Sequence, residues 1–99
     1  MSKKLRCLIL LMILTTSANA CDTKLLLAIE QVESRGNPNA IGDKGQAVGC
    51  LQIHPIVIAD VNRIIGKNRY LLLDRLDRNK SFCIAKIYLN HYAKNKSNE

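Results

Sequence analysis

The stretch AIEQVESRGNPNAIGDKGQAVGCLQIHP, residues 28–55, decides the fold, because it changes from a helical pattern to a turn-rich β pattern within a few residues. Its beginning continues an apolar stripe at helical spacing that is formed by Leu25, Ile29 and Val32. The sequence therefore predicts a helix over residues 24–35 that leads directly into a small β element.

The predicted helix has clear stop signals. Gly36 suits a left-handed C-cap, and Pro38 cannot continue a helix. The letters GDKG and AVGCLQI that follow combine turn residues with strand formers, which is typical of a small hairpin or an irregular β segment. We expect Pro55 to end this segment.

The remainder of the chain reads as mostly helical. Residues 56–65 have apolar positions at helical spacing, and Gly66 is their stop signal. Residues 67–80, KNRYLLLDRLDRNK, are either a connection or a short helix. Apolar residues recur at spacings of three and four toward the C-terminal end, which predicts a last helix that starts at Asn79 or Ser81 and runs to about Ala93. The predicted fold class is mostly α (α+β), with one minor β-hairpin.

The first twenty residues have the layout of a secretory signal peptide. A basic start, MSKKLR, precedes the apolar run CLILLMIL, which is too short to span a bilayer, and the small residues of TTSANA follow. Cleavage near Ala20 predicts a secreted or periplasmic domain over residues 21–94 with a disordered tail at 95–99. Removal of the signal peptide leaves 12 basic and 8 acidic residues, so the mature chain has a net charge of +4, whereas the full chain has +7. This suits an anionic partner such as a cell wall, and no basic run points to nucleic acid.

The cysteines agree with export. Cys21, Cys50 and Cys83 remain after the signal, and a domain of this size commonly needs a covalent staple. A disulfide between Cys50 and Cys83 would close a loop of about 33 residues, worth about 3–4 kcal/mol in the chain-entropy model. Cys21 is a free thiol, an intermolecular partner or a lipid-modified membrane tether, although Ala18 and Asn19 fit a lipobox poorly.

Carboxylates are the main candidates for chemistry. His54 and His91 are isolated and the cysteines lack C-x-x-C spacing, so we expect no metal and no cofactor. Ser34 lacks the glycine-flanked elbow of a serine hydrolase, and there is no phosphate-binding loop. The internal acids are Glu30, Glu33, Asp43, Asp60, Asp74 and Asp77.

Glu33 is distinguished by its position. It lies one residue past Val32, at the edge of the apolar stripe, whereas Glu30 falls outside the stripe. The C-terminal end of a helix disfavours a negative charge, and apolar neighbours act in the same direction. Both effects favour the protonated acid, which a glycosidase uses to protonate a leaving oxygen. The alternative is an ordinary solvated glutamate on a helix surface.

The order E-S-R-G-N-P-N-A … G-Q-A-V-G-C-L-Q-I … P resembles the soluble lytic transglycosylase (SLT) domain of the lysozyme-like superfamily. That family carries a catalytic E-S pair at a helix end, then N-P-x-A, then a G-A-x-G-L-M-Q-type hairpin. The resemblance covers about thirty residues and continues more weakly through SFCIAKIYLNHYAK, residues 81–94. It implies cleavage of the β-1,4 bond between N-acetylmuramic acid and N-acetylglucosamine in peptidoglycan.

The resemblance also implies roles for single residues. Glu33 would protonate the glycosidic oxygen and then act as base on a hydroxyl of the same sugar, closing a 1,6-anhydro ring without a second carboxylate. Ser34 and Gln52 match site residues and would contact substrate; otherwise they are a helix-end residue and a solvent-facing strand residue. Asp43, if it faces Glu33, would activate water and give hydrolysis as in a lysozyme. Its alternative is a turn aspartate that bonds its own backbone.

The sequence departs from the family pattern in two places. Cys50 stands where the family has Leu, and residues 92–99 contain no equivalent of the A-Y-N-x-G motif that builds the opposite wall of the groove. We therefore expect a domain without its usual C-terminal helices, with a protein partner as one candidate to cover the exposed surface. A catalytically inactive peptidoglycan-binding or assembly module is the alternative function, and a small secreted helical interaction protein is a third. Wall turnover, a secretion apparatus and phage or prophage lysis or entry all fit this pattern.

Overall fold

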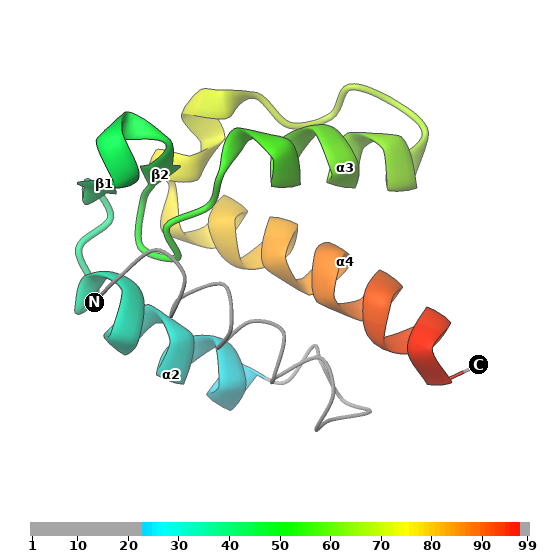
Figure 1. The fold of residues 1–99 in the computed structure, drawn as a ribbon, viewed down its shortest axis with the longest axis horizontal. Coiled ribbons are helices and arrows are strands. Elements are labelled where there is room, and N and C mark those ends of the chain that lie inside the picture. The colour runs from blue at the N-terminus through cyan, green and yellow to red at the C-terminus, as the bar shows by residue number, and fades with distance from the viewer. Residues whose placement is uncertain (1–22, 98–99) are drawn as a thin grey trace.

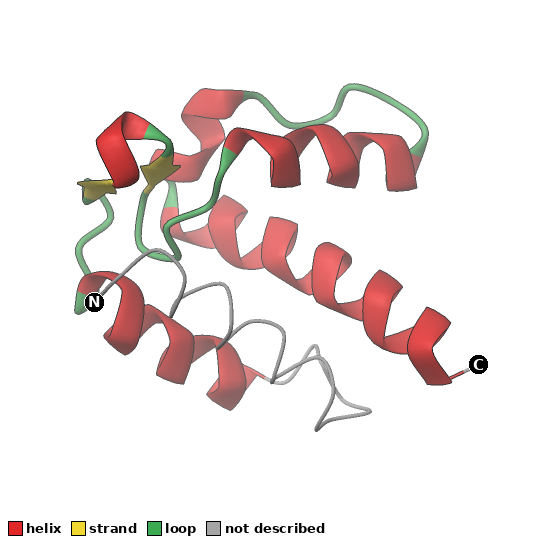
Figure 2. Ribbon diagram, in the orientation of Figure 1, coloured by secondary structure: helices red, strands yellow, loops and turns green. Residues whose placement is uncertain are grey.

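The computed structural model describes residues 23–97, which form a mostly helical domain with one small antiparallel sheet (Figures 1 and 2). The predicted fold class is therefore confirmed. The expected signal peptide at 1–20, Cys21 and the end of the expected tail, 98–99, lie outside the described residues. In chain order the elements are α2 (Thr23–Ser34), β1 (Ile41–Gly42), η1 (Asp43–Gly45), β2 (Ala47–Val48), α3 (Pro55–Ile65), η2 (Leu72–Leu76) and α4 (Arg78–Ser97).

The hairpin lies where the helices converge. In Figure 1, α2 ends beside the two strands, and both α3 and α4 begin near them and run away side by side. α4 packs against α3 and against η2. Within the described part of the chain, no helix has the length and hydropathy needed to cross a membrane.

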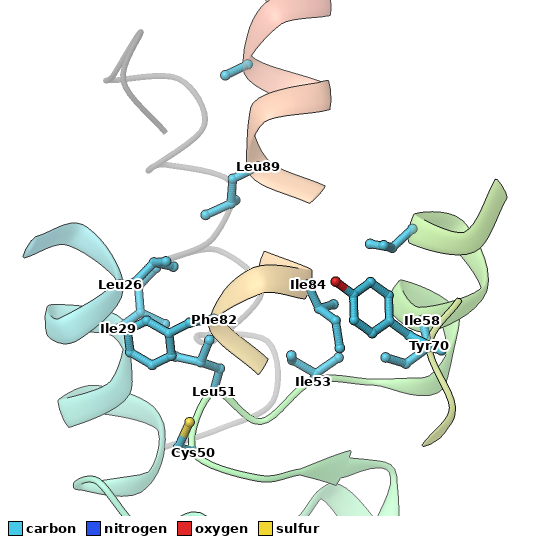
Figure 3. Close-up of a cluster of buried hydrophobic side chains, with 12 residues drawn as sticks. Leu26, Ile29, Cys50, Leu51, Ile53, Ile58, Tyr70, Phe82, Ile84 and Leu89 are labelled. Atoms are coloured by element: carbon cyan, nitrogen blue, oxygen red, sulfur yellow. The ribbon is translucent and has the colours of Figure 1, made fainter. Parts of the chain in front are cut away.

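The core forms around the first turns of α4 (Figure 3). On one side, Leu26 and Ile29 of α2 face Phe82, and on the other, Tyr70 lies beside Ile58 of α3. Burying these side chains supplies the main favourable free energy of folding. The buried cluster consists of Leu26, Ile29, Cys50, Leu51, Ile53, Ile58, Val61, Tyr70, Phe82, Ile84, Leu89 and Ala93.

α3 has well-defined ends. Pro55 does end the hairpin segment as expected, and it also begins α3, because proline is well suited to the first turn of a helix. Gly66 caps the C-terminal end at φ 88° and donates its N–H to the carbonyl of Asn62. The side chain of Asn62 then exchanges two hydrogen bonds of 2.9 Å with the backbone of Tyr70, which holds the returning chain against the helix.

The connection between α3 and α4 contains a short 3₁₀ helix, η2, so both readings of residues 67–80 hold in part. Asp74 accepts the backbone N–H of Leu71 at 2.8 Å and pairs with Lys80 at 3.2 Å. Asp77 accepts the N–H of Lys80 at 3.0 Å, which satisfies one of the first donors of α4. α4 continues to Ser97, beyond the end expected near residue 93.

The predicted disulfide between Cys50 and Cys83 is wrong, because both residues are free thiols. Cys50 is fully buried between α2 and the hairpin, whereas Cys83 lies on the exposed face of α4. The pattern of α4 explains the difference, since Phe82 and Ile84 on either side of Cys83 supply the buried face. Burial raises the pKa of the Cys50 thiol to about 11, so this thiol is not a reactive nucleophile.

Candidate active site

Glu33 is the second-last residue of α2, at the end that meets the hairpin. Its side chain is half-buried, and Oε1 is shielded from solvent. The carboxyl group is therefore held at the boundary between core and surface rather than in bulk water. The stripe predicted for this helix differs from the observed one, because Val32 is exposed and the buried residues of α2 are Leu26, Ile29 and Glu30.

The chain reverses direction immediately after Glu33. Arg35 and Gly36 both adopt left-handed backbone conformations, with φ of 54° and 83°. The side chain of Asn37 accepts the N–H of Asn39 at 2.9 Å, which is the turn that an Asn-Pro-Asn sequence favours. The sharp turn brings the hairpin back over the end of α2.

Ser34 fastens the helix end to the hairpin. Its hydroxyl donates to the carbonyl of Cys50 at 2.6 Å and accepts the N–H of Gly36 at 3.1 Å. A third contact, to the carbonyl of Glu30 at 3.3 Å, follows the back-bonding pattern of serines at helix ends. The hydroxyl thus fixes the backbone next to Glu33, which is a positioning role.

The β-hairpin is small and tightly turned. Ile41 pairs with Val48 and Gly42 with Ala47, and η1 joins the two strands. A further bridge, from Val48 to Ile53, extends the ladder toward α3. Two neighbouring residues of η1 that are not glycine, Asp43 and Lys44, have positive φ of 49° and 56°. Such strain persists only where surrounding contacts stabilise it.

Asp43 faces His54. Its Oδ2 is buried and lies 3.4 Å from Nε2 of His54, so protonation of His54 would make this contact an ion pair. The pair joins the hairpin turn to the residue that precedes α3. His54 looked isolated in the sequence, because its partner lies eleven residues earlier in a turn.

Gln52 is buried in the turn between β2 and α3. Its backbone is left-handed, with φ of 52°, and its Nε2 donates to the carbonyls of Ala40 and Gly49, both at 3.0 Å. The side chain therefore holds the two sides of the hairpin together. It also lines a cleft of about 60 Å³ with His54. The alternative of a solvent-facing strand residue is wrong, because Gln52 is buried and lies in a turn.

The cleft is mostly apolar. Gln52 and His54 are its polar side chains besides the Tyr88 hydroxyl, and the other walls come from α2, α3, α4 and the turn between β2 and α3. These apolar walls are formed by Leu26, Ile29, Leu51, Ile53, Val57, Ala85, Tyr88 and Leu89.

A buried arginine in the connection between α3 and α4 stabilises the hairpin. Arg75 of η2 donates to the carbonyls of Gln46 and Ile53, both at 2.9 Å, and its Nε donates to Leu72. Burial lowers the pKa of this guanidinium from its ordinary value. Ser81 completes the support by donating to the carbonyl of Arg75 at 2.9 Å. Sequence reasoning missed Arg75, since a charge in a connecting segment is normally solvated.

Glu30 has a structural role that the sequence did not reveal. It is only 3% exposed, and both of its oxygens accept hydrogen bonds from Arg78, at 2.7 and 3.0 Å. The Cys50 thiol also bonds this carboxylate. The hydrogen bond from Arg78 is the main reason why the pKa of Glu30 lies below its ordinary value of 4.5. Arg78 in turn lies over the ring of Phe82, 4.6 Å from its centre.

The described part of the chain contains no group of His, Cys, Asp or Glu side chains that could hold a metal ion. The structure brings together the half-buried carboxyl group of Glu33, the half-buried hydroxyl of Ser34 at the end of α2, the buried amide of Gln52 in the turn before α3, and the Asp43–His54 pair across the hairpin. A positioned carboxyl group of this kind can take part in acid–base chemistry.

A helical domain with an acid at a helix end and a short hairpin beside it has the architecture of a lysozyme-like domain. The family model described as "Transglycosylase SLT domain" matches residues 11–99, and the chain belongs to this family. At the level of the family, this means a lytic transglycosylase or lysozyme-like glycosidase activity directed at peptidoglycan. Comparisons with curated proteins and with solved structures gave no match.

Proposed function

We propose that this protein is a lytic transglycosylase in which Glu33 alone supplies the acid and base. Glu33 protonates the oxygen of the β-1,4 bond between N-acetylmuramic acid and N-acetylglucosamine. The resulting carboxylate of Glu33 then removes the proton from the C6 hydroxyl of the muramic acid. The C6 oxygen bonds to C1 of the same sugar, which closes the 1,6-anhydro ring. The observation that carries the proposal is the half-buried carboxyl of Glu33, positioned at a helix end under the hairpin.

The surroundings of Asp43 support a single-carboxylate mechanism. A hydrolytic lysozyme needs a second carboxylate that is available to a water molecule. The Oδ2 of Asp43 is instead buried against His54, and its side chain is 14% exposed. We assign Asp43 to holding the hairpin turn.

Ser34 and Gln52 are proposed to act through the backbone that they hold. Ser34 ties Cys50 to the helix end, and Gln52 ties Gly49 to Ala40. Both side chains fix the position of the hairpin relative to Glu33, so that a bound sugar would lie in one orientation relative to the carboxyl group. This proposal also requires export, since peptidoglycan lies outside the cytoplasm, and residues 1–20 are the segment proposed to direct it.

The test is digestion of purified peptidoglycan, followed by mass spectrometry of the released muropeptides. We expect anhydro products, which are lighter by one water than hydrolysis products. Glu33→Gln keeps the shape of the side chain and should lower the rate by about 100-fold or more. Asp77→Asn is the matched control, because it removes an exposed carboxylate at the start of α4, where asparagine still caps a helix.

Three outcomes would contradict the proposal. Products with a reducing end would indicate hydrolysis instead of transglycosylation. Equal rates of peptidoglycan digestion by wild type and Glu33→Gln would exclude Glu33 as the catalytic acid. If neither protein digests peptidoglycan, the proposed enzymatic activity is excluded. Sedimentation of an inactive protein with peptidoglycan would then favour the binding-module alternative. Thermal melting of both variants shows whether a loss of activity comes from unfolding.

A further inference from the structure

A second, larger hollow lies between α3 and α4, outside the arrangement around Glu33. Its volume is about 400 Å³. These two helices run side by side away from the hairpin (Figure 1). The residues that line it are Ile56, Val57, Ala59, Asp60, Arg63, Tyr88 and Tyr92.

The polar groups of this hollow form an ordered cluster. Asp60 accepts hydrogen bonds from the Tyr92 hydroxyl and, at 3.0 Å, from Nε of Arg63. The bond from Tyr92 is the main cause that lowers the pKa of Asp60, so this carboxylate stays charged. The ring of Tyr92 is also held by Tyr88 and His91, each with its ring centre 4.9 Å away.

The exposed charge of the cluster is positive. Both Asp60 oxygens are engaged and its side chain is 18% exposed, whereas the side chain of Arg63 is 64% exposed. Arg63 binds Asp60 through Nε and Nη2, and its other edge is available to a carboxylate. The surrounding walls are apolar and are formed by Ile56, Val57, Ala59 and the ring of Tyr88. A fitting ligand therefore combines a carboxylate with small apolar groups.

The hollow adjoins the cleft that Gln52 and His54 line, which Glu33 does not line. Val57 and Tyr88 line both cavities, and the cleft is also lined by Gln52 and His54. A polymer held at the hairpin could therefore place a side branch against Arg63. In peptidoglycan, the branch on each muramic acid is a short peptide with free carboxylates and alanine methyl groups.

We propose that the α3–α4 hollow is a recognition site for the acidic, alanine-containing stem peptide of peptidoglycan, with Arg63 binding a carboxylate and Tyr88 and Ile56 contacting the methyl groups. This inference rests on the proposed function for its choice of substrate, and it adds a peptide contact to the glycan contact at Glu33. It requires peptide-bearing strands to bind better than strands without peptide.

Binding can be measured without any cleavage. The full chain, labelled with ¹⁵N, is titrated with the tetrapeptide L-Ala–γ-D-Glu–L-Lys–D-Ala, with the same peptide amidated at its carboxylates, and with N,N′-diacetylchitobiose. We expect the acidic peptide to shift the backbone amides of residues 56–63 and 88–92, and the amidated peptide to have little effect. Arg63→Gln should weaken binding about tenfold, through loss of one charge-assisted hydrogen bond.

Matched variants separate this contact from general charge effects. Lys67→Gln removes an exposed positive charge that does not line the hollow, and it should bind the peptide as the wild type does. Arg63→Lys keeps the charge but not the planar fork, so its affinity should fall between those of wild type and Arg63→Gln. Thermal melting confirms that each variant is folded.

The result that overturns the inference is equal binding of the acidic and amidated peptides, or equal affinity of wild type and Arg63→Gln. Shifts of the same amides by chitobiose alone would overturn it too, since the hollow would then bind sugar. If the protein fails to cleave peptidoglycan but binds the acidic peptide, the proposed function fails while the peptide site stands. If the protein cleaves peptidoglycan and does not bind the peptide, the peptide site fails while the proposed function stands.

Discussion

Glu30 and Glu33 lie one helical turn apart on α2, and their surroundings give them opposite roles. Glu30 is buried, receives two hydrogen bonds from Arg78 and stays ionised, so it is unsuited to donate a proton. Glu33 lies at the helix end beside the turn and is only half-buried. Burial alone therefore does not single out a candidate acid on α2, because the more deeply buried of the two glutamates is held as an ion pair by Arg78.

The ion pair of Glu30 predicts a specific pH dependence of stability. Glu30→Gln should lower the free energy of unfolding at pH 7 by about 2 kcal/mol, because it replaces charge-assisted hydrogen bonds with weaker ones. Since the folded-state pKa of Glu30 is below its ordinary value of 4.5, the stabilisation is fully present above that value. It is lost as the pH falls through the folded-state pKa.

Urea unfolding of wild type and Glu30→Gln between pH 7 and pH 3 checks this expectation. The difference between the two proteins should be constant from pH 7 to about pH 5 and should then shrink. A difference that persists unchanged at the acidic end would mean that the Glu30 carboxylate does not stabilise the fold through its charge.

The two described cysteines should differ strongly in reactivity. Alkylation of the native protein, followed by peptide mass spectrometry, should modify the exposed Cys83 and spare the buried Cys50 until denaturant is added. Adding a reductant should leave the melting temperature unchanged, because these two thiols are not joined. A peptide in which Cys50 is linked to Cys83 would contradict the structure.

The hairpin depends on the close approach of η2. A Cβ atom at Gly49 would lie 1.8 Å from the carbonyl oxygen of Arg75, and Gly49 has φ of 88°. Gly45 has a similar φ of 90°, but a Cβ atom there would meet nothing within 4 Å. The two glycines therefore separate backbone strain from steric conflict.

We expect Gly49→Ala to destabilise the domain by about 3 kcal/mol or more, from strain and overpacking together. Gly45→Ala should cost only about 1–2 kcal/mol, from the left-handed backbone alone. Chemical denaturation measures both values. Equal losses for the two variants would mean that η2 does not press against the hairpin as the structure has it.

Local patterns predicted the elements well because their causes are local. The apolar periodicity of α2 and α3, the stop at Gly66 and the turn residues of the hairpin act within a few positions along the chain. The predicted start of α4, Asn79 or Ser81, was one or three residues late, and its predicted end near Ala93 was about four residues short. Its polar end carries no apolar stripe, so the hydrophobic pattern gave no reason to extend the helix.

The long-range contacts were not predictable in the same way. Glu30 looked like a surface residue because Arg78, its partner, lies 48 positions away. The disulfide prediction counted cysteines and loop length, but the direction in which Cys83 leaves α4 depends on which face of that helix is buried. Sequence reasoning did select Glu33, Ser34, Asp43 and Gln52, which the fold gathers around the hairpin, and their roles in catalysis stay predictions.

The buried arginine beneath the hairpin has a consequence for how the protein is made. During translation, α2 and both strands leave the ribosome well before Arg75, which is 29 positions beyond its acceptor Gln46. Until that residue emerges, the carbonyls of Gln46 and Ile53 lack the donor that the finished fold gives them. A chain that ended before Arg75 would therefore keep both strands but lack two of the hydrogen bonds that fix them, so the rigidity of this turn depends on a segment far downstream of it.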